Sequence, residues 1–171
     1  AAAAYAFKSG ENAVSPTSGF HHASYHGGGA YCTFNGLIVA ARILHDVHGA
    51  KKIGIIDLDN HYGNGTAGLV STLKLDYVVH YTLGGDHFSN SDEWINKFGD
   101  MIAEKFKGCD VVIAQCGADA HIDDPLGGHF TTKQLFQRDF VLFKTLKRLG
   151  IPCAWTLAGG YQNPIEKVLE I

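Results

Sequence analysis

The sequence is poor in the features that mark membrane, secreted and nucleic-acid-binding proteins. No apolar run reaches the roughly 18 residues that a membrane-spanning helix needs, and the start of the chain lacks the basic region and cleavage site of a signal peptide. Charged residues make up only 18% of the chain; the 14 basic ones are scattered among 17 acidic ones, for a formal net charge of −3. This distribution argues against an electrostatic nucleic-acid footprint. We therefore expect a cytoplasmic protein that binds neither membranes nor nucleic acids directly.

Cysteine is also scarce, with four residues in 171: Cys32, Cys109, Cys116 and Cys153. They form no Cys-x-x-Cys pair, and a chain of this length does not need disulfides to fold. At least two of them stand in or beside apolar, strand-like runs, where a free thiol usually behaves as a small buried side chain. We expect reduced, structural cysteines. Hydrophobic residues make up 46% of the chain, enough for a packed core.

Segments of helical and strand character alternate along the chain. The first 17 residues carry little signal, and no repeat or linker marks a domain boundary, so residues 1–171 are read as one domain. Strands that alternate with helices predict an α/β fold, with a mostly parallel sheet covered by helices on both faces. The expected helices are 36–48, 66–73, 91–107 and 131–149, with a last one beginning near 163. The expected strands are 53–58, 77–81, 110–115 and 151–157.

Two of these helices have more specific signals. Thr131 followed by Gln134 is a capping-box start, and Gly150 is a stop signal at the other end of that helix. In the 36–48 helix, helical spacing predicts an apolar face made of Leu37, Val39, Ala40, Ile43 and Leu44.

Polar residues gather where the expected strands end, which is where parallel sheets bind ligands. The strongest group is Asp57, Asp59 and His61, which alternation places on one side of the chain. Two carboxylates that close an apolar strand are costly to bury unless they are paired or bind a metal, although they could simply cap a turn. Asp119 follows another strand and offers a third ligand. Its rivals lie further into the loop: Asp123 and Asp124.

Two carboxylates and one histidine leave an open coordination position, as catalytic zinc sites require. Fe²⁺ or Mn²⁺ would accept the same ligands. The histidine count of 10 alone does not choose between a metal site and acid–base chemistry.

Two further segments carry groups suited to catalysis. His21 and His22 are adjacent and precede a glycine run, and imidazoles beside a metal can serve as general base and acid. Tyr161 follows Gly159 and Gly160 after the last strand, where its hydroxyl could donate to a developing oxyanion or simply face water.

Taken together, these segments resemble the histone deacetylase family, which lies within the arginase–deacetylase superfamily. They occur in the order that the family has and extend from about Ser18 to Gln162. The matching stretches are Ser18-Gly19-Phe20-His21-His22-Ala23, Ala30-Tyr31-Cys32-Thr33-Phe34-Asn35, Ile56-Asp57-Leu58-Asp59-Asn60-His61-Tyr62-Gly63-Asn64-Gly65-Thr66, Gln115-Cys116-Gly117-Ala118-Asp119, Asp124-Pro125-Leu126-Gly127 and Gly159-Gly160-Tyr161.

The resemblance implies roles for individual residues. It gives Asp59, His61 and Asp119 as the ligands of a zinc ion, with Fe²⁺ as an alternative metal. It gives His21 and His22 as the tandem catalytic histidines, with His22 the better candidate for the general base and then acid.

The remaining implied roles belong to the surroundings of these groups. Tyr161 would polarise the substrate carbonyl, and Asp57 would orient His21 and help to hold a potassium ion. Asn64 stands where many members have an aspartate that pairs with the second histidine. The aromatic walls of the substrate tunnel would be Tyr31 and Phe88. Val78 falls where many members have a serine near the potassium site, which puts that ion in doubt.

The resemblance therefore implies zinc-dependent hydrolysis of an N-acetyl amide, in which a metal-activated water attacks, tyrosine stabilises the oxyanion and a histidine protonates the amine. The substrate would be an acetylated lysine in a peptide or protein, or a small acylated amine. The alternatives are an acetylpolyamine or other small-amide amidohydrolase and a catalytically idle member that binds acylated ligands. Because the family's catalytic domain is usually longer than 171 residues, we expect an incomplete version of its three-layer α/β/α fold. The oligomeric state is left open.

Overall fold

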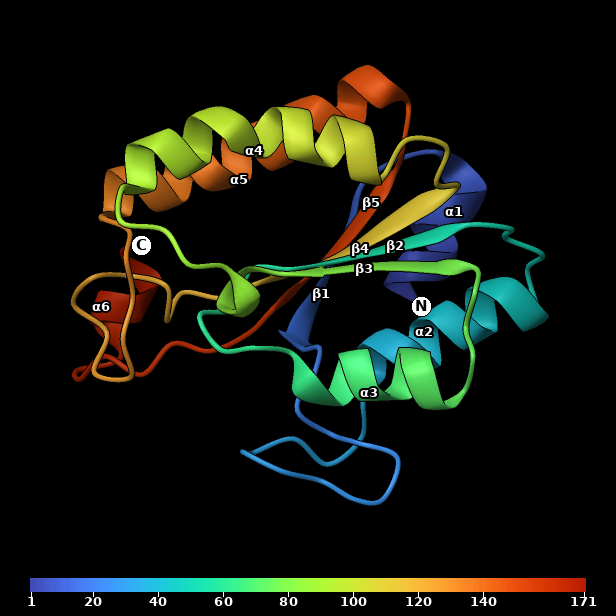
Figure 1. Cartoon of the computed structure of the whole chain (residues 1–171), viewed down its shortest axis with the longest axis horizontal. Helices are drawn as coiled ribbons and strands as arrows, with labels where there is room; N and C mark the ends of the chain where they lie inside the picture. Colours follow the sequence, from blue (N-terminus) through green and yellow to red (C-terminus); the bar gives the residue numbers. More distant parts are fainter.

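All five strands of the protein lie in one sheet, in the order β1-β5-β4-β2-β3. A computed structural model describes residues 1–171, and every neighbouring pair of strands in it is parallel (Figure 1). Every residue of β2 is buried, as its nearly unbroken apolar sequence predicts for a strand that is covered on both faces. The strands are β1 (Ala13–Ser18), β2 (Ile53–Asp57), β3 (Val78–Thr82), β4 (Val111–Cys116) and β5 (Cys153–Leu157).

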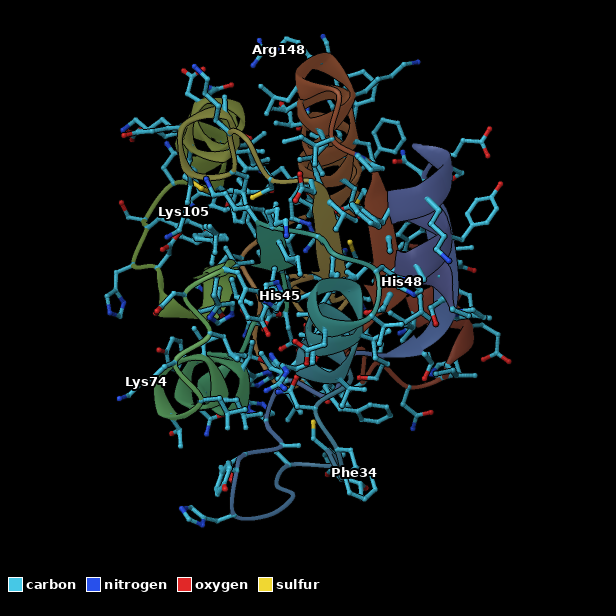
Figure 2. All side chains as sticks on the ribbon, turned by 90° about the vertical axis from the view of Figure 1, so that its right-hand side faces the viewer. Phe34, His45, His48, Lys74, Lys105 and Arg148 are labelled. Carbon is cyan, nitrogen blue, oxygen red and sulfur yellow. The ribbon has the colours of Figure 1, made fainter.

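Helices cover both faces of this sheet, which confirms the predicted three-layer α/β/α fold. One face carries α1 (Ala2–Ser9), α2 (Gly36–Asp46) and α3 (Asn64–Thr72), and the other carries α4 (Ser91–Lys105) and α5 (Thr132–Leu149) (Figures 1 and 2). Each face encloses its own hydrophobic core, of 14 and 18 buried residues respectively. Two short elements complete the chain: the 3₁₀ turn η1 (Leu83–Gly85) and α6 (Glu166–Leu169).

Side-chain caps determine where several helices begin. Asn35 accepts a hydrogen bond from the Ile38 amide at the start of α2, and Asn90 caps α4 in the same way. At the start of α5 both halves of the predicted capping box are present, between Thr131 and Gln134, and the helix ends at Gly150 in a left-handed conformation.

The sequence prediction was wrong about which face of α2 is buried. Leu37 and Leu44 are buried as expected, but the other buried positions are Ile38 and Ala41. Val39 and Ile43 are 52% and 45% exposed. Because nearly every position of this helix is apolar, the spacing alone does not fix which side of the helix faces the sheet.

The two ends of the chain also differ from expectation. Residues 1–17, which carried little sequence signal, form α1 and most of β1. β1 pairs with β5, about 140 residues away in the chain, so local sequence gives no hint of its partner. The final helix, expected to begin near 163, is the single turn α6. All four cysteines are free thiols, and three of them are buried. None of the helices combines the length and the apolar character that crossing a membrane requires.

The order of the strands creates a switch point between β2 and β4. β3 follows β2 on one side, and the chain then returns to place β4 on the other side of β2. The segments that leave these two strands therefore lead to opposite faces: the one after β2 to α3, and the one after β4 to α5 (Figure 1). Doubly wound sheets bind ligands at such a position, outside the carboxyl ends of the strands.

The opposite end of the molecule has a different character. Figure 2 views the amino ends of the strands, where the labelled Lys105 and Arg148 occupy the last turns of α4 and α5. Basic side chains at these positions complement the negative carboxyl ends of the helices. These two basic residues therefore have a structural explanation and do not indicate a binding site.

Candidate metal and catalytic site

Three side chains that could bind a metal meet at the switch point. Ligand atoms of Asp59, His61 and Asp119 all lie within 4.8 Å of one another. The Nδ1 atom of His61 is 3.0 Å from Oδ1 of Asp59 and 2.9 Å from Oδ2 of Asp119. Asp59 and His61 follow β2, whereas Asp119 follows β4, so the ligand set exists only because these two strands are neighbours.

Backbone amides hold both carboxylates in place. The Asn60 amide donates to Asp119 (3.1 Å), and the Gly159 amide donates to Asp59 (3.0 Å). Position 159 requires glycine because a Cβ atom there would overlap the carboxyl group of Asp119. The turn after β5 therefore packs directly against the carboxylates that β2 and β4 present.

The donor set fits a divalent cation. Asp59 and Asp119 are 3% and 0% exposed, so two carboxyl groups lie side by side away from water. Burial and the neighbouring charge of Asp59 raise the pKa of Asp119 to about 7. Burial opposes protonation of His61, but contact with Asp59 and Asp119 outweighs it and raises the pKa of this histidine. The set thus attracts positive charge, and it consists of ligands that zinc accepts.

The tandem histidines lie beside this ligand set, each with a different partner. The Nδ1 atom of His21 is 2.6 Å from Oδ2 of Asp57, and both side chains are buried. The Nδ1 atom of His22 is 2.6 Å from Oδ1 of Asn64. The two imidazole rings are 4.0 Å apart between centroids, and the His22 ring lies 6.2 Å from that of His61.

These partners give the two histidines different chemistry. Burial opposes the charging of His21, but the hydrogen bond and charge of Asp57 outweigh it, so the pKa of His21 is raised. An amide oxygen can only accept a hydrogen bond, so His22 places its proton on Nδ1 and leaves the lone pair of Nε2 free. His22 is therefore suited to take a proton, and His21 to carry one.

A cavity of about 200 Å³ connects these groups to the surface. Tyr161 lines it and is 39% exposed, with its ring 6.3 Å from that of Tyr31. Burial, and then the charges of Asp59 and Asp119, raise the pKa of Tyr161 to about 12, so its hydroxyl keeps its proton at neutral pH. The residues that line the cavity include Ser18, Phe20, His21, His22, Tyr31, Cys32, Asp59, His61, Gln115, Ala158 and Tyr161.

Phe88 does not line this cavity. Its ring packs 5.6 Å from Trp94, 4.9 Å from His129 and 5.6 Å from Phe130, measured between centroids. The structure therefore places Phe88 in an aromatic cluster beside the α4 core rather than opposite Tyr31. The tunnel role of Phe88 came from the family resemblance alone, across a loop in which the sequence match fades.

Asp57 lies beside His21, as the resemblance implies, but its neighbour on β3 differs from expectation. Asp57 lies outside the ligand set and accepts from His21 and from Gln115. The β3 residue that pairs with Asp57 is Thr82, whereas Val78 lies at the other end of that strand, in the core. The hydroxyl near Asp57 is therefore supplied by Thr82, which accepts from the Gly63 amide at 3.1 Å. The potassium ion stays a prediction.

The rival carboxylates have structural roles. Asp124 accepts from the Leu126 amide, as expected of a turn residue, and also from the Tyr161 amide at 2.8 Å. It thereby anchors the backbone that carries the tyrosine. Asp123 is not part of the ligand set.

Sequence reasoning missed two buried residues that support the site. Gln115 donates to Asp57 at 3.2 Å, and its position in the matched stretch before Asp119 was the available signal. Arg138 donates to two backbone carbonyls beneath the metal ligands. Its signal was a single charged residue in the apolar stripe of a helix.

Comparison with known proteins is consistent with this site. A family model described as the histone deacetylase domain matches residues 1–82. A curated relative, Histone deacetylase 14, chloroplastic, from Arabidopsis thaliana, is 31% identical over 88% of this chain and 44% of its own length. The acetylpolyamine amidohydrolase of Mycoplana ramosa is 28% identical over 84% of this chain and 50% of its own.

The fold has a solved counterpart as well. The crystal structure of the HDA15 HD domain has a TM-score of 0.73 and 25% identity, and the match covers 99% of this chain and 57% of that one. The chain spans about half the length of the curated relatives that it matches.

Proposed function

This chain belongs to the histone deacetylase family, and we propose that it hydrolyses the N-acetyl amide of an acetylated lysine or of a similar acylated amine, with a zinc ion held by Asp59, His61 and Asp119. One observation carries the proposal: the three ligands lie within 4.8 Å of one another, beside two histidines and a tyrosine that line the same cavity. An arrangement built only for structure would have no reason to direct these groups into a cavity.

The resident metal would supply one part of the chemistry. When bound, zinc provides a Lewis acid that polarises a carbonyl and acidifies a water molecule. The two buried carboxylates supply the negative charge that holds such a cation, and His61 completes a set of three ligands with an open position.

The histidines would move the protons. The free Nε2 of His22 accepts the proton of the attacking water and later returns it to the departing amine, since Asn64 keeps its Nδ1 proton in place. Asp57 raises the pKa of His21 and so favours the charged form of this imidazole next to the reacting groups. Because their partners differ, His22 would transfer the proton and His21 would provide positive charge.

Tyr161 would stabilise the oxyanion. Its hydroxyl keeps its proton, so it can donate to the oxygen on which negative charge develops. The bond from its amide to Asp124 fixes the backbone at this residue. Tyr31 lines the cavity and is 87% exposed, and it would contact the substrate chain.

The test is metal analysis of the purified chain, together with turnover of a fluorogenic acetyl-lysine peptide and, in parallel, of acetylated polyamine. The second substrate is included because one relative is named acetylpolyamine amidohydrolase. We expect about one zinc per chain and hydrolysis of at least one substrate, both abolished in His61→Ala. A folded chain that binds no zinc would overturn the proposal. A chain that binds zinc but turns over neither substrate would favour the alternative of a catalytically idle family member that binds acylated ligands.

A further inference from the structure

A fully buried arginine lies beneath the metal ligands. Arg138 is 2% exposed and occupies the inward stripe of α5, between Leu135 and Leu142. A leucine would satisfy the hydrophobic pattern at this position. Burying a guanidinium instead is costly unless its donors are satisfied, so the contacts of this side chain should explain why it is there.

Those contacts are with the two strands that present the ligands. Nη1 of Arg138 donates to the carbonyl oxygens of Leu58 and Gly117, each at 3.1 Å. Leu58 directly precedes Asp59, and Gly117 stands two residues before Asp119. Nε donates to Asp139, the next residue of α5, at 2.8 Å.

The switch point explains why these carbonyls need a donor. The last backbone hydrogen bond between the two strands runs from the Leu58 amide to the Gln115 carbonyl, and past it the two chains stay close, since a Cβ atom on Gly117 would lie 2.8 Å from the Cα atom of Asp59. Beyond this point no backbone amide donates to the carbonyl oxygen of Leu58 or of Gly117, so neither has a partner in the strand ladder. One nitrogen of Arg138 satisfies both carbonyls and so bridges the two turns.

We infer that Arg138 is a positioning residue for the metal site: it sets the spacing between the turns that present Asp59 and Asp119. The inference rests on the proposed function to the extent that these residues bind zinc. Arg138 itself touches neither metal nor substrate, and its buried positive charge also offsets part of the repulsion between the two carboxylates.

Three variants separate positioning from general stability. Arg138→Met keeps an unbranched stem and removes every donor, and Arg138→Lys keeps the charge but lacks the planar guanidinium. Leu142→Ala is the matched control: it removes a fully buried side chain one helical turn away, in the same core, without polar contact to the site. Circular dichroism first establishes that each variant is folded at the working temperature.

The measurements are the rate at which zinc passes to a chromogenic chelator and the visible spectrum of the cobalt-loaded protein. We expect Arg138→Met to release zinc at least about tenfold faster than wild type, with an altered cobalt spectrum, as loss of an outer-shell partner would cause. The zinc release rate of Arg138→Lys should lie between those of wild type and Arg138→Met. Leu142→Ala should match wild type in both measurements. If Arg138→Met does not fold, Arg138→Lys provides the same comparison.

Wild-type release rates and spectra in folded Arg138 variants would overturn the inference and leave the proposed function standing. A different pair of results would support the inference and overturn the proposed function: the wild-type protein binds zinc but hydrolyses no acetyl amide, and the Arg138 variants release zinc faster than wild type does. If the wild-type protein bound neither zinc nor cobalt, both the inference and the proposed function would be refuted.

Discussion

The stability of the protein should decrease in mild acid because of one histidine outside the site. His80 lies on β3, and its Nε2 atom is buried without a hydrogen-bond partner. Burial, followed by the positive charges of Lys105 and His21, lowers the pKa of His80 from 6.5 to about 4. The folded protein therefore keeps this imidazole neutral at a pH where the unfolded chain has already protonated it.

The sign and size of the effect follow from that difference. Between pH 6.5 and about 4, unfolding takes up a proton at His80, so the free energy of unfolding decreases as the pH falls. The contribution amounts to about 2 kcal/mol at pH 5 and approaches about 3 kcal/mol below pH 4. In His80→Leu this part of the pH dependence should disappear, because leucine fills a similar volume and does not titrate.

The assay is urea unfolding of wild type and His80→Leu at pH 7.5 and pH 5, with a chelator present so that metal release does not contribute. We expect the difference in unfolding free energy between the two proteins to change by about 2 kcal/mol across this range. His26→Gln, in an exposed loop, removes an imidazole that is accessible to solvent and serves as the control. Parallel pH profiles for wild type and His80→Leu would refute the reasoning.

Three further substitutions test other parts of the structure. Tyr161→Phe should keep its zinc but lose about 100-fold or more in kcat, as expected for removal of an oxyanion donor; unchanged kcat would exclude that role. Gly19→Ala should destabilise the fold by about 1–3 kcal/mol in urea unfolding, because its Cβ would overlap the side chains of Gln115 and Leu37, whereas Gly27→Ala, which meets nothing within 4 Å, should be tolerated. Thr131→Val should cost about 1 kcal/mol by removing the capping box of α5, and an unchanged Tm would contradict it.

The central part of the fold could be predicted from local sequence because its signals are strong. β2 and β4 are short, nearly unbroken apolar runs, and α5 has a capping box at one end and a glycine at the other. The polar residues that end β2 and β4 follow these strands directly, so the carboxyl edge of the sheet could be identified as the place for Asp59, His61 and Asp119.

The features that could not be predicted depend on contacts between distant segments. β1 contains Pro16 and alternates between partly buried and exposed residues, and it is a strand because β5 offers it an edge. The buried face of α2 was ambiguous because Val39 and Ile43 are as apolar as Ile38 and Ala41. A charged residue in the apolar stripe of α5 marks Arg138 as unusual, but its partners are backbone carbonyls just past β2 and β4, which no spacing rule identifies.

The return of the chain at the switch point divides the site between two halves of the sequence. The part up to β3 supplies both tandem histidines, Asp59 and His61, whereas the part from β4 onward supplies Asp119 and Tyr161. A metal bound between them therefore acts as a reversible cross-link between the halves, and its binding free energy adds to the cohesion of β2 and β4. If the chain were cut in the connection 86–90, zinc would favour reassociation of the two pieces. In the intact chain, loss of the metal would weaken the centre of the sheet before either outer layer.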